Sequence, residues 1–388
     1  MRPEQFNAMA AAVLKRHPRL SDILFTVGAS VQAEVDGELV PVRVRGLETL
    51  TPENTRAVAE CVLGDHLVHR RALAERGSCD LSHALSSEAR FRVNVFKQRG
   101  NLAVVMRRLP QVIPGMADLG LPPVFREIVR ERHGLVLITG GTGTGKSNSL
   151  AALVDAVNAE RAVHIVTLED PVEFVHAHKK GVVSQRELHT DFDSFASGLR
   201  AALRQAPKVI MVGEIRDRET MEIALQAAGT GHLVLATLHT SDAGTTISRI
   251  LGLFERHEER LVRMQLAESL RFVISQRLLP RVGGGRIAAF EVLRNTLRVR
   301  ELVLQGEQGG KSFYEVLEEG GTHGMNTFDQ SLFALFEQGF IEENTALLSA
   351  SDRARLVRLL DRLKSSRGES VSDLRLSGIE EDLDADLR

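Results

Sequence analysis

The central part of the chain alternates short apolar runs with longer stretches in which apolar residues recur every three to four positions. The short runs are too brief for helices and predict buried strands, whereas the longer stretches predict amphipathic helices. The predicted strands cover 135–139, 164–168, 209–212 and 233–237, and the predicted helices include 147–158, 192–204 and 218–229. This alternation predicts a doubly wound, mostly parallel α/β sheet whose ligands bind beyond the carboxyl ends of the strands.

The first 112 residues carry a different pattern, in which strand-like runs follow a short helical start. The runs lie at 22–26, 31–35, 39–44, 91–96 and 102–106. Asp36-Gly37 stands between the second and third runs and is typical of a tight hairpin turn. We therefore predict a small α+β domain over residues 1–112.

A proline-rich segment separates this region from the rest of the chain. Residues 109–123 hold four of the eleven prolines, which predicts a linker over 113–123 and a second domain over 124–364. After Gly252 the pattern predicts long helices and one strand over 286–293. The last segment, 365–388, carries seven acidic and three basic residues, which predicts an acidic, disordered tail or a short interaction peptide.

The composition is that of an ordinary globular protein, and it argues against several classes. The 49 Lys and Arg nearly balance the 51 Asp and Glu, which disfavours a dedicated nucleic-acid binder. Two cysteines cannot build a four-cysteine zinc site, and in a chain of 388 residues they favour a reducing compartment. No segment reaches the ~18 consecutive apolar residues of a membrane span. We expect a cytoplasmic protein that meets the membrane only through a partner.

Residues 140–147 match the phosphate-loop pattern G-x-x-x-x-G-K-[ST] without a mismatch, between a predicted strand and a predicted helix. Glycines let backbone N–H groups turn toward an anion, and the following helix N-terminus adds partial positive charge. We expect Lys146 to reach the β- and γ-phosphates of ATP and the Ser147 hydroxyl to ligate Mg²⁺. The predicted nucleotide-binding residues are Gly140, Gly141, Thr142, Gly143, Thr144, Gly145, Lys146, Ser147 and Asn148.

Carboxylates and histidines flank the other predicted strands. Glu173 follows the strand over 164–168, and Glu214 follows the strand over 209–212. His232 precedes and His239 follows the strand over 233–237. Phosphoryl transfer needs mainly positioning and charge neutralisation, so we expect the carboxylates to serve Mg²⁺ and the nucleophile. Spacing alone does not assign the two roles. Glu214 suits the magnesium side, directly or through water, which leaves Glu173 to orient or deprotonate the attacking water.

The sequence resembles the PilT-type ATPases of bacterial type IV pili, within the secretion ATPase superfamily. Besides the phosphate loop, three blocks carry the resemblance: TLEDPVEFVH at 167–176, IMVGEIRD at 210–217 and GHLVLATLHT at 231–240. The resemblance implies a PAS-like N-terminal domain and a RecA-like P-loop ATPase core, assembled as a homohexamer with ATP between subunits. The roles it implies are catalytic glutamate for Glu173, Walker B carboxylate for Glu214, sensing of the γ-phosphate for His232 and His239, and contact near a phosphate for Arg92 and Arg107.

Three positions depart from the pattern of that family. Lys208 stands where the family usually has an aspartate, and Gly229 stands where a glutamate is common. The C-terminal motif that the family ties to retraction is reduced to RVRELVLQ at 298–305. These departures leave the nucleotide site intact and bear on the specific role of the motor.

The leading functional hypothesis is therefore a hexameric Mg-ATP-hydrolysing motor that powers type IV pilus retraction and twitching motility. Its expected partners are an inner-membrane pilus platform protein and a paralogous pilus ATPase. An accessory PilU-like ATPase or a divergent pilus or secretion ATPase is the alternative, although extension and secretion ATPases typically carry a four-cysteine zinc site. Alternatives of another class are a RecA-like nucleic-acid motor and a nucleotide-sensing regulator.

Overall fold

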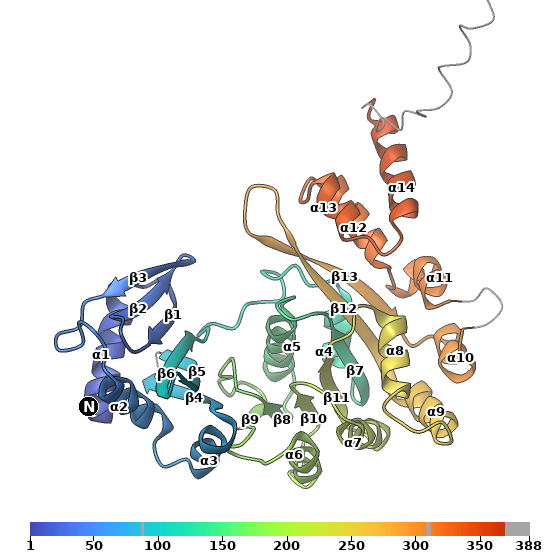
Figure 1. The fold of residues 1–388 in the computed structure, drawn as a ribbon. Helices are drawn as coiled ribbons and strands as arrows, with labels where there is room; N and C mark the ends of the chain where they lie inside the picture. The colour runs from blue at the N-terminus through green and yellow to red at the C-terminus, as the bar shows by residue number, and fades with distance from the viewer. Residues whose placement is uncertain (87–88, 308–311, 369–388) are drawn as a thin grey trace, which may run out of the picture.

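The computed structural model of the chain describes residues 1–86, 89–307 and 312–368, arranged as two units side by side (Figure 1). Each unit is built on its own sheet, with six strands in the N-terminal domain and seven in the core domain. Residues 109–123 join the two and form neither helix nor strand. Most of the predicted acidic tail, 369–388, lies outside the described residues.

The sheet of the N-terminal domain is antiparallel throughout and has the order β3-β2-β1-β6-β5-β4. Its helix α2 packs on β6, α1 packs on α2, and α3 packs on β4. Phe6, Phe25 and Phe91 are fully buried between the sheet and these helices. The elements are α1 (Pro3–Arg16), β1 (Leu20–Phe25), β2 (Val31–Val35), β3 (Glu38–Val42), α2 (Pro52–Leu63), α3 (Leu67–Arg76), β4 (Ser78–Ser86), β5 (Ala89–Gln98) and β6 (Asn101–Arg108).

Two hairpins of this sheet turn through residue pairs with left-handed backbone angles. The φ angles are 54° and 88° at Asp36 and Gly37, and 49° and 78° at Arg99 and Gly100. Two consecutive positive φ angles fit a two-residue hairpin loop whose twist matches that of the strands. The predicted turn at Asp36-Gly37 is thus confirmed. The second turn fixes the register of β5 on β6, from Gln98 opposite Asn101 onward.

The core domain carries a mostly parallel sheet of order β13-β12-β7-β11-β10-β8-β9, in which only the edge strand β13 runs antiparallel. Successive residues of β7 face opposite sides: Leu135 and Leu137 join one apolar cluster, Val136 and Ile138 the other. The strands are β7 (Gly134–Thr139), β8 (His164–Glu169), β9 (Val182–Glu187), β10 (Val209–Val212), β11 (Leu233–Leu238), β12 (Leu270–Pro280) and β13 (Arg286–Arg294).

Helices cover both faces of this sheet, and a group of short helices extends beyond its antiparallel edge (Figure 1). None of the described helices is long and apolar enough to cross a membrane. The helices are α4 (Val124–Arg130), α5 (Lys146–Glu160), α6 (Phe195–Ala202), α7 (Arg218–Gly229), α8 (Ala243–Leu251), α9 (Glu259–Ser269), α10 (Leu297–Gln305), α11 (Phe313–Glu318), the 3₁₀ helix η1 (Glu319–His323), α12 (Phe328–Glu337), α13 (Glu343–Leu348) and α14 (Arg353–Ser366).

Part of the secondary structure differs from the sequence-based expectation. The region after Gly252, predicted as long helices with one strand, contains the eleven-residue strand β12. This strand lies between β7 and β13, so Ser275 and Gln276 are buried together with the apolar residues, and no alternating pattern marks it. The predicted helix over 192–204 begins only after Ser194, whose Oγ accepts from the Ser197 N–H at 3.2 Å. Strands β4 and β9 carry no clear pattern either.

Candidate active site

The phosphate loop connects the carboxyl end of β7 to the N-terminus of α5, as its motif predicts. Gly140, Gly143 and Gly145 have φ angles of 145°, 78° and 89°, a region that side chains disfavour. A Cβ at Gly140 would also stand 2.4 Å from the backbone oxygen of Gln276. Glycine is therefore required at Gly140 both for backbone conformation and for close packing against β12.

Lys146 carries the positive charge inside this loop. Its Nζ donates to the backbone oxygens of Gly140 and Gly141, each at 2.7 Å. Burial lowers the pKa of Lys146, while the nearby charge of Glu214 opposes that shift. Thr144 Oγ1 donates to the Gly141 oxygen at 3.0 Å and braces the same turn. The loop thus holds an ammonium group in a curved backbone whose N–H groups adjoin a helix N-terminus, which is an anion-binding arrangement.

Gln276 on β12 fixes the loop from behind, and sequence reasoning missed it. Its Nε2 donates to the Thr144 oxygen at 2.7 Å, and its Oε1 accepts from Ser149 Oγ at 2.8 Å. One side chain thereby ties β12 to the loop and to the first turns of α5. The only available signal would have been a polar residue in a buried strand, and β12 itself had not been recognised.

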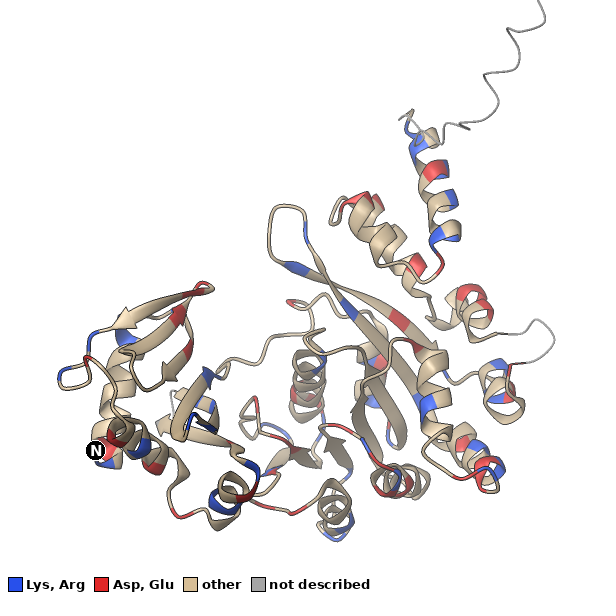
Figure 2. Ribbon diagram, in the orientation of Figure 1, with Lys and Arg blue, Asp and Glu red and all other residues tan. Residues whose placement is uncertain are grey.

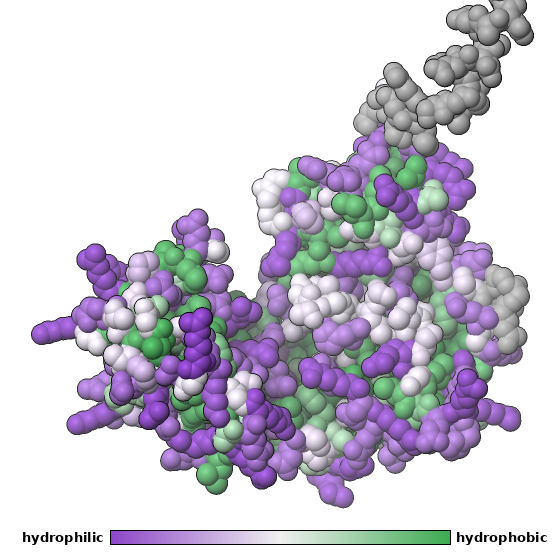
Figure 3. Space-filling view, in the orientation of Figure 1, coloured by the Kyte–Doolittle hydropathy of each residue, from purple (hydrophilic) through white to green (hydrophobic). Residues whose placement is uncertain are grey.

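A cavity of about 590 Å³ opens at the carboxyl edge of the core sheet, where the N-terminal domain faces the core. The surface is hollowed between the two domains (Figure 3). The cavity brings together most of the predicted site residues, from both domains: Arg92, Thr142, Gly143, Gly145, Lys146, Ser147, Asn148, Glu173, Glu214 and His239. It is also lined by Glu169, Arg216 and Arg286, which had not been singled out.

Glu214 follows β10 and is largely enclosed, with a side chain that is 13% exposed. Its Oε1 forms an ion pair with Arg216, and its Oε2 lies 3.3 Å from Nε2 of His239. That Oε2 is buried and accepts no hydrogen bond from the described residues. A buried carboxylate oxygen with an unused lone pair, in the same cavity as the Ser147 hydroxyl, has the oxygen chemistry that Mg²⁺ prefers.

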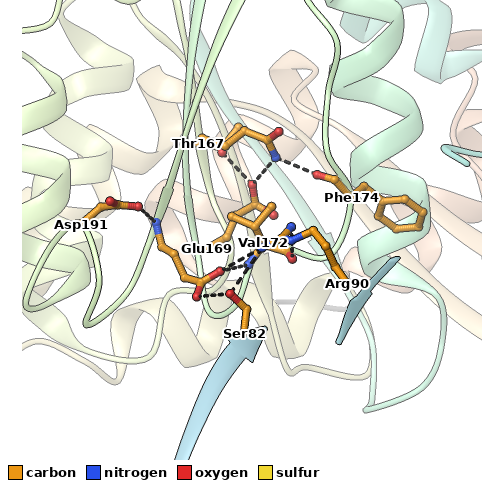
Figure 4. A network of polar contacts seen from close by, with 9 residues as sticks. Ser82, Arg90, Thr167, Glu169, Val172, Phe174 and Asp191 are labelled. Atoms are coloured by element: carbon orange, nitrogen blue, oxygen red, sulfur yellow. Dashed lines mark hydrogen bonds and ion pairs between the residues drawn. The ribbon is translucent and has the colours of Figure 1, made fainter. Parts of the chain in front are cut away.

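Glu169 ends β8 and is buried beneath the segment that carries Glu173. Thr167 Oγ1 and Gln185 Nε2 donate to its Oε1 at 2.6 and 3.0 Å (Figure 4). Burial raises the pKa of Glu169 to about 7, and the two hydrogen bonds only partly offset that effect. Glu169 is therefore a further carboxylate beside Glu173 and Glu214 in the site, but it is held by its own protein partners.

Two of the residues predicted to take part in catalysis lie away from this cavity. His232 precedes β11 and binds the Ala227 oxygen through Nδ1 at 3.1 Å, at the end of the strand opposite to His239. Arg107 lies opposite Arg92 on β6, but its Nε donates to Asp22 at 2.9 Å and its side chain is 70% exposed. Within one chain, both side chains therefore lie outside the cavity that the phosphate loop lines. Gly140, Gly141 and Thr144 belong to the phosphate loop but are not among the residues that line the cavity.

The departures from the family pattern also lie outside the cavity. Lys208 is exposed at the amino end of β10, opposite to Glu214. Gly229 is exposed at the end of α7, with open space where a Cβ would stand. Neither substitution touches the phosphate loop or the carboxylates.

The family described as "Type II/IV secretion system protein" matches residues 26–318 of the chain. The chain belongs to this family. Within the type II/IV secretion system proteins it is 41% identical to the type IV pilus retraction ATPase PilT of Pseudomonas aeruginosa, over 84% of this chain and 93% of that protein. It is 39% identical to the type IV pilus ATPase PilU of the same organism, over 91% of each chain.

A solved structure extends these similarities to the fold. The crystal structure of the pilus retraction motor PilT with bound ADP superposes with a TM-score of 0.80, covering 89% of this chain and 98% of that one, at 41% identity. The comparisons confirm the predicted PilT-type resemblance, the predicted ATPase class and the predicted fold of a small N-terminal domain with an ATPase core.

Replacing Gln276 by Ala should weaken nucleotide binding. The change removes two hydrogen bonds that brace the phosphate loop, each worth about 1 kcal/mol, so we expect up to about thirtyfold weaker binding of a fluorescent ATP analogue. Gln226→Ala, at an exposed position of α7, is the matched control and should bind as the wild type does. Unchanged affinity in the Gln276 variant would contradict the bracing role.

Glu169→Gln should change the pH dependence of stability. Because the pKa of Glu169 is raised from 4.5 to about 7, the folded protein holds this proton more tightly, and its free energy of unfolding falls as pH rises between those values. A Gln at this position does not titrate, so the variant does not undergo this fall in the free energy of unfolding. The melting temperature of the variant minus that of the wild type should therefore increase from about pH 5 to about pH 8 in thermal scans. The control Glu222→Gln, on an exposed face, should show a constant difference, and a constant difference in Glu169→Gln would refute the assignment.

Proposed function

We propose that the chain is a Mg²⁺-dependent ATPase motor that powers type IV pilus retraction. One observation carries the proposal: a single cavity combines the phosphate loop with Glu173, Glu214 and His239. The fold that holds this cavity is shared with a structure described as the pilus retraction motor PilT with bound ADP. ATP is the proposed substrate, and force production is the proposed output.

Ser147 and Glu214 would hold Mg²⁺. Mg²⁺ usually takes one or two protein ligands beside substrate phosphates, and Ser147 and Glu214 line the same cavity. When bound, Mg²⁺ neutralises charge on the β- and γ-phosphates.

The chain's own residues divide the remaining work. Lys146 binds the phosphates from inside the loop, and Glu173 orients the attacking water and accepts its proton. Arg92 lines the cavity from β5 of the N-terminal domain, with its Nε 4.0 Å from Asp80 Oδ1. Its charge would stabilise the phosphoryl group in the transition state when the two domains close. Domain closure would thus be coupled to hydrolysis.

A homohexamer with ATP between subunits would account for the residues that lie outside the cavity. Arg107 is exposed on β6, and His232 lies at the amino end of β11, so each could reach a nucleotide only in a neighbouring subunit. We propose this assembly at the cytoplasmic side of an inner-membrane pilus platform protein, with a paralogous pilus ATPase as a further partner.

An accessory role like that of PilU is the second candidate. The chain matches PilU over 91% of both lengths, and α10 carries a reduced form of the retraction motif. A nucleic-acid motor has less support, because Lys and Arg are interspersed with Asp and Glu over both domains (Figure 2).

Two substitutions should separate binding from hydrolysis. Lys146→Ala removes the charge that holds the phosphates, so it should abolish both nucleotide binding and turnover. Glu173→Gln should retain binding and lose at least about a hundredfold in kcat, because only the base is removed. Phosphate release and equilibrium binding measure the two effects. Full activity of Glu173→Gln would refute the assignment of the base.

Deletion of the gene in its host tests the direction of force. A retraction motor predicts excess surface pili and no twitching, since pili extend but are not withdrawn. Absent pili would instead indicate assembly, and a defect rescued by a paralogue would indicate the accessory role. Electron microscopy of pili and a twitching assay distinguish these outcomes.

A further inference from the structure

The segment that carries Glu173 has no secondary structure of its own. It is residues 170–176 of the connection between β8 and β9, which runs over 170–181 and contains neither helix nor strand. Val172, Phe174 and His176 are buried, whereas Glu173 between them lines the cavity. The position of Glu173 therefore depends on what holds the backbone of its neighbours.

Two side chains of β9 hold this backbone from one face. Gln185 Nε2 donates to the Phe174 oxygen, and Gln185 Oε1 accepts from the His176 N–H, both at 2.7 Å. Glu187 Oε2 accepts from the Val172 N–H at 3.1 Å. Residues two apart on a strand share a face, so Gln185 and Glu187 together bind alternate residues of the segment.

The N-terminal domain contributes to the second of these contacts. Ser82 Oγ on β4 donates to Glu187 Oε1 at 2.7 Å. Arg90 on β5 places Nη2 3.5 Å from Glu187 Oε2, and its Nη1 donates to the Val172 oxygen at 3.1 Å (Figure 4). Both backbone groups of Val172 are thus bound, its N–H by the core domain and its oxygen by the N-terminal domain.

The ion pair between Arg90 and Glu187 is largely buried, so losing it should affect the segment that it holds. The side chains of Arg90 and Glu187 are 23% and 11% exposed. Charge-assisted hydrogen bonds in such surroundings are stronger than neutral ones, and removing Arg90 would leave the buried Glu187 without its cationic partner and the Val172 oxygen without its donor. The phosphate loop takes no part in this contact, since its braces are Lys146 and Gln276.

We propose that Ser82, Arg90 and Glu187 form an interdomain positioning contact that places Glu173 for hydrolysis only while the N-terminal domain rests against the core. The inference builds on the proposed role of Glu173. When the domains separate, Val172 loses Arg90 and Glu187 loses its two N-terminal partners, while Gln185 keeps its hold on residues 174 and 176. Separation would then stop the chemical step and leave nucleotide affinity unchanged.

Arg90→Gln in the full chain tests this positioning role. We expect kcat to fall about tenfold or more, with KM and the nucleotide Kd within about twofold of wild type, because the base is misplaced while the phosphate loop is intact. Ser82→Ala should show a smaller loss of the same kind. Arg43→Gln, an exposed arginine of the same domain, is the matched control and should behave as the wild type. A raised KM or Kd with unchanged kcat would instead assign Arg90 to nucleotide binding and overturn the proposal.

A double variant tests whether Arg90 acts through Glu173. In a Glu173→Gln background, Arg90→Gln should reduce the residual turnover no further, because the group that it positions is already gone. An additive loss would overturn the proposal by showing that Arg90 acts on the reaction independently.

Hydrogen exchange gives a readout that does not depend on turnover. In Arg90→Gln the amide of Val172 should exchange faster, while that of His176, held by Gln185, should stay protected; overlapping peptides separate the two. Unchanged exchange at Val172 would refute the contact itself. An enzyme without turnover but with this exchange pattern would refute the proposed function and leave the positioning contact standing.

Discussion

Parallel pairing of the core strands is the constraint on which the site depends. Val212 lies level with Leu168 on one side and Ala236 on the other, and Leu238 lies level with Thr139. Strands that run together and end together deliver their following loops to one edge. The phosphate loop, Glu173, Glu214 and His239 share a cavity for this reason. The same rule explains the position of His232. This residue precedes β11 and so lies at the opposite, amino-terminal ends of the strands.

The sequence predicted those parts of the site that depend on local pattern. The phosphate loop is a contiguous motif, and the buried runs of β7, β8, β10 and β11 are short enough to be read as strands, so the edge that they share could be inferred. Strand β12 could not be predicted in this way. Both of its faces are buried, Ser275 and Gln276 among the buried residues, so the strand shows no alternation of apolar and polar residues. Gln276 was missed with its strand.

The interdomain contact was beyond sequence reasoning for a different reason. Ser82 and Glu187 are 105 positions apart, and Arg90 and Val172 are 82 apart. Nothing in the local pattern marks an ordinary serine or arginine of an antiparallel strand as a partner for a backbone oxygen in another domain. Only the folded arrangement of the two domains brings these atoms together. Under the proposed assignment, nucleotide binding uses residues of one domain, whereas the chemical step requires both.

The turn at Arg99-Gly100 has a consequence for how this protein can vary. Arg90 and Arg92 share one face of β5, and the two-residue turn sets the register that holds this face in place. Surface turns are ordinarily where a chain tolerates added residues. A slip of one position here would carry both arginines to the other face of the sheet, away from Val172 and from the cavity. Selection that keeps Arg90 and Arg92 in place should therefore also keep the length of this short exposed turn constant.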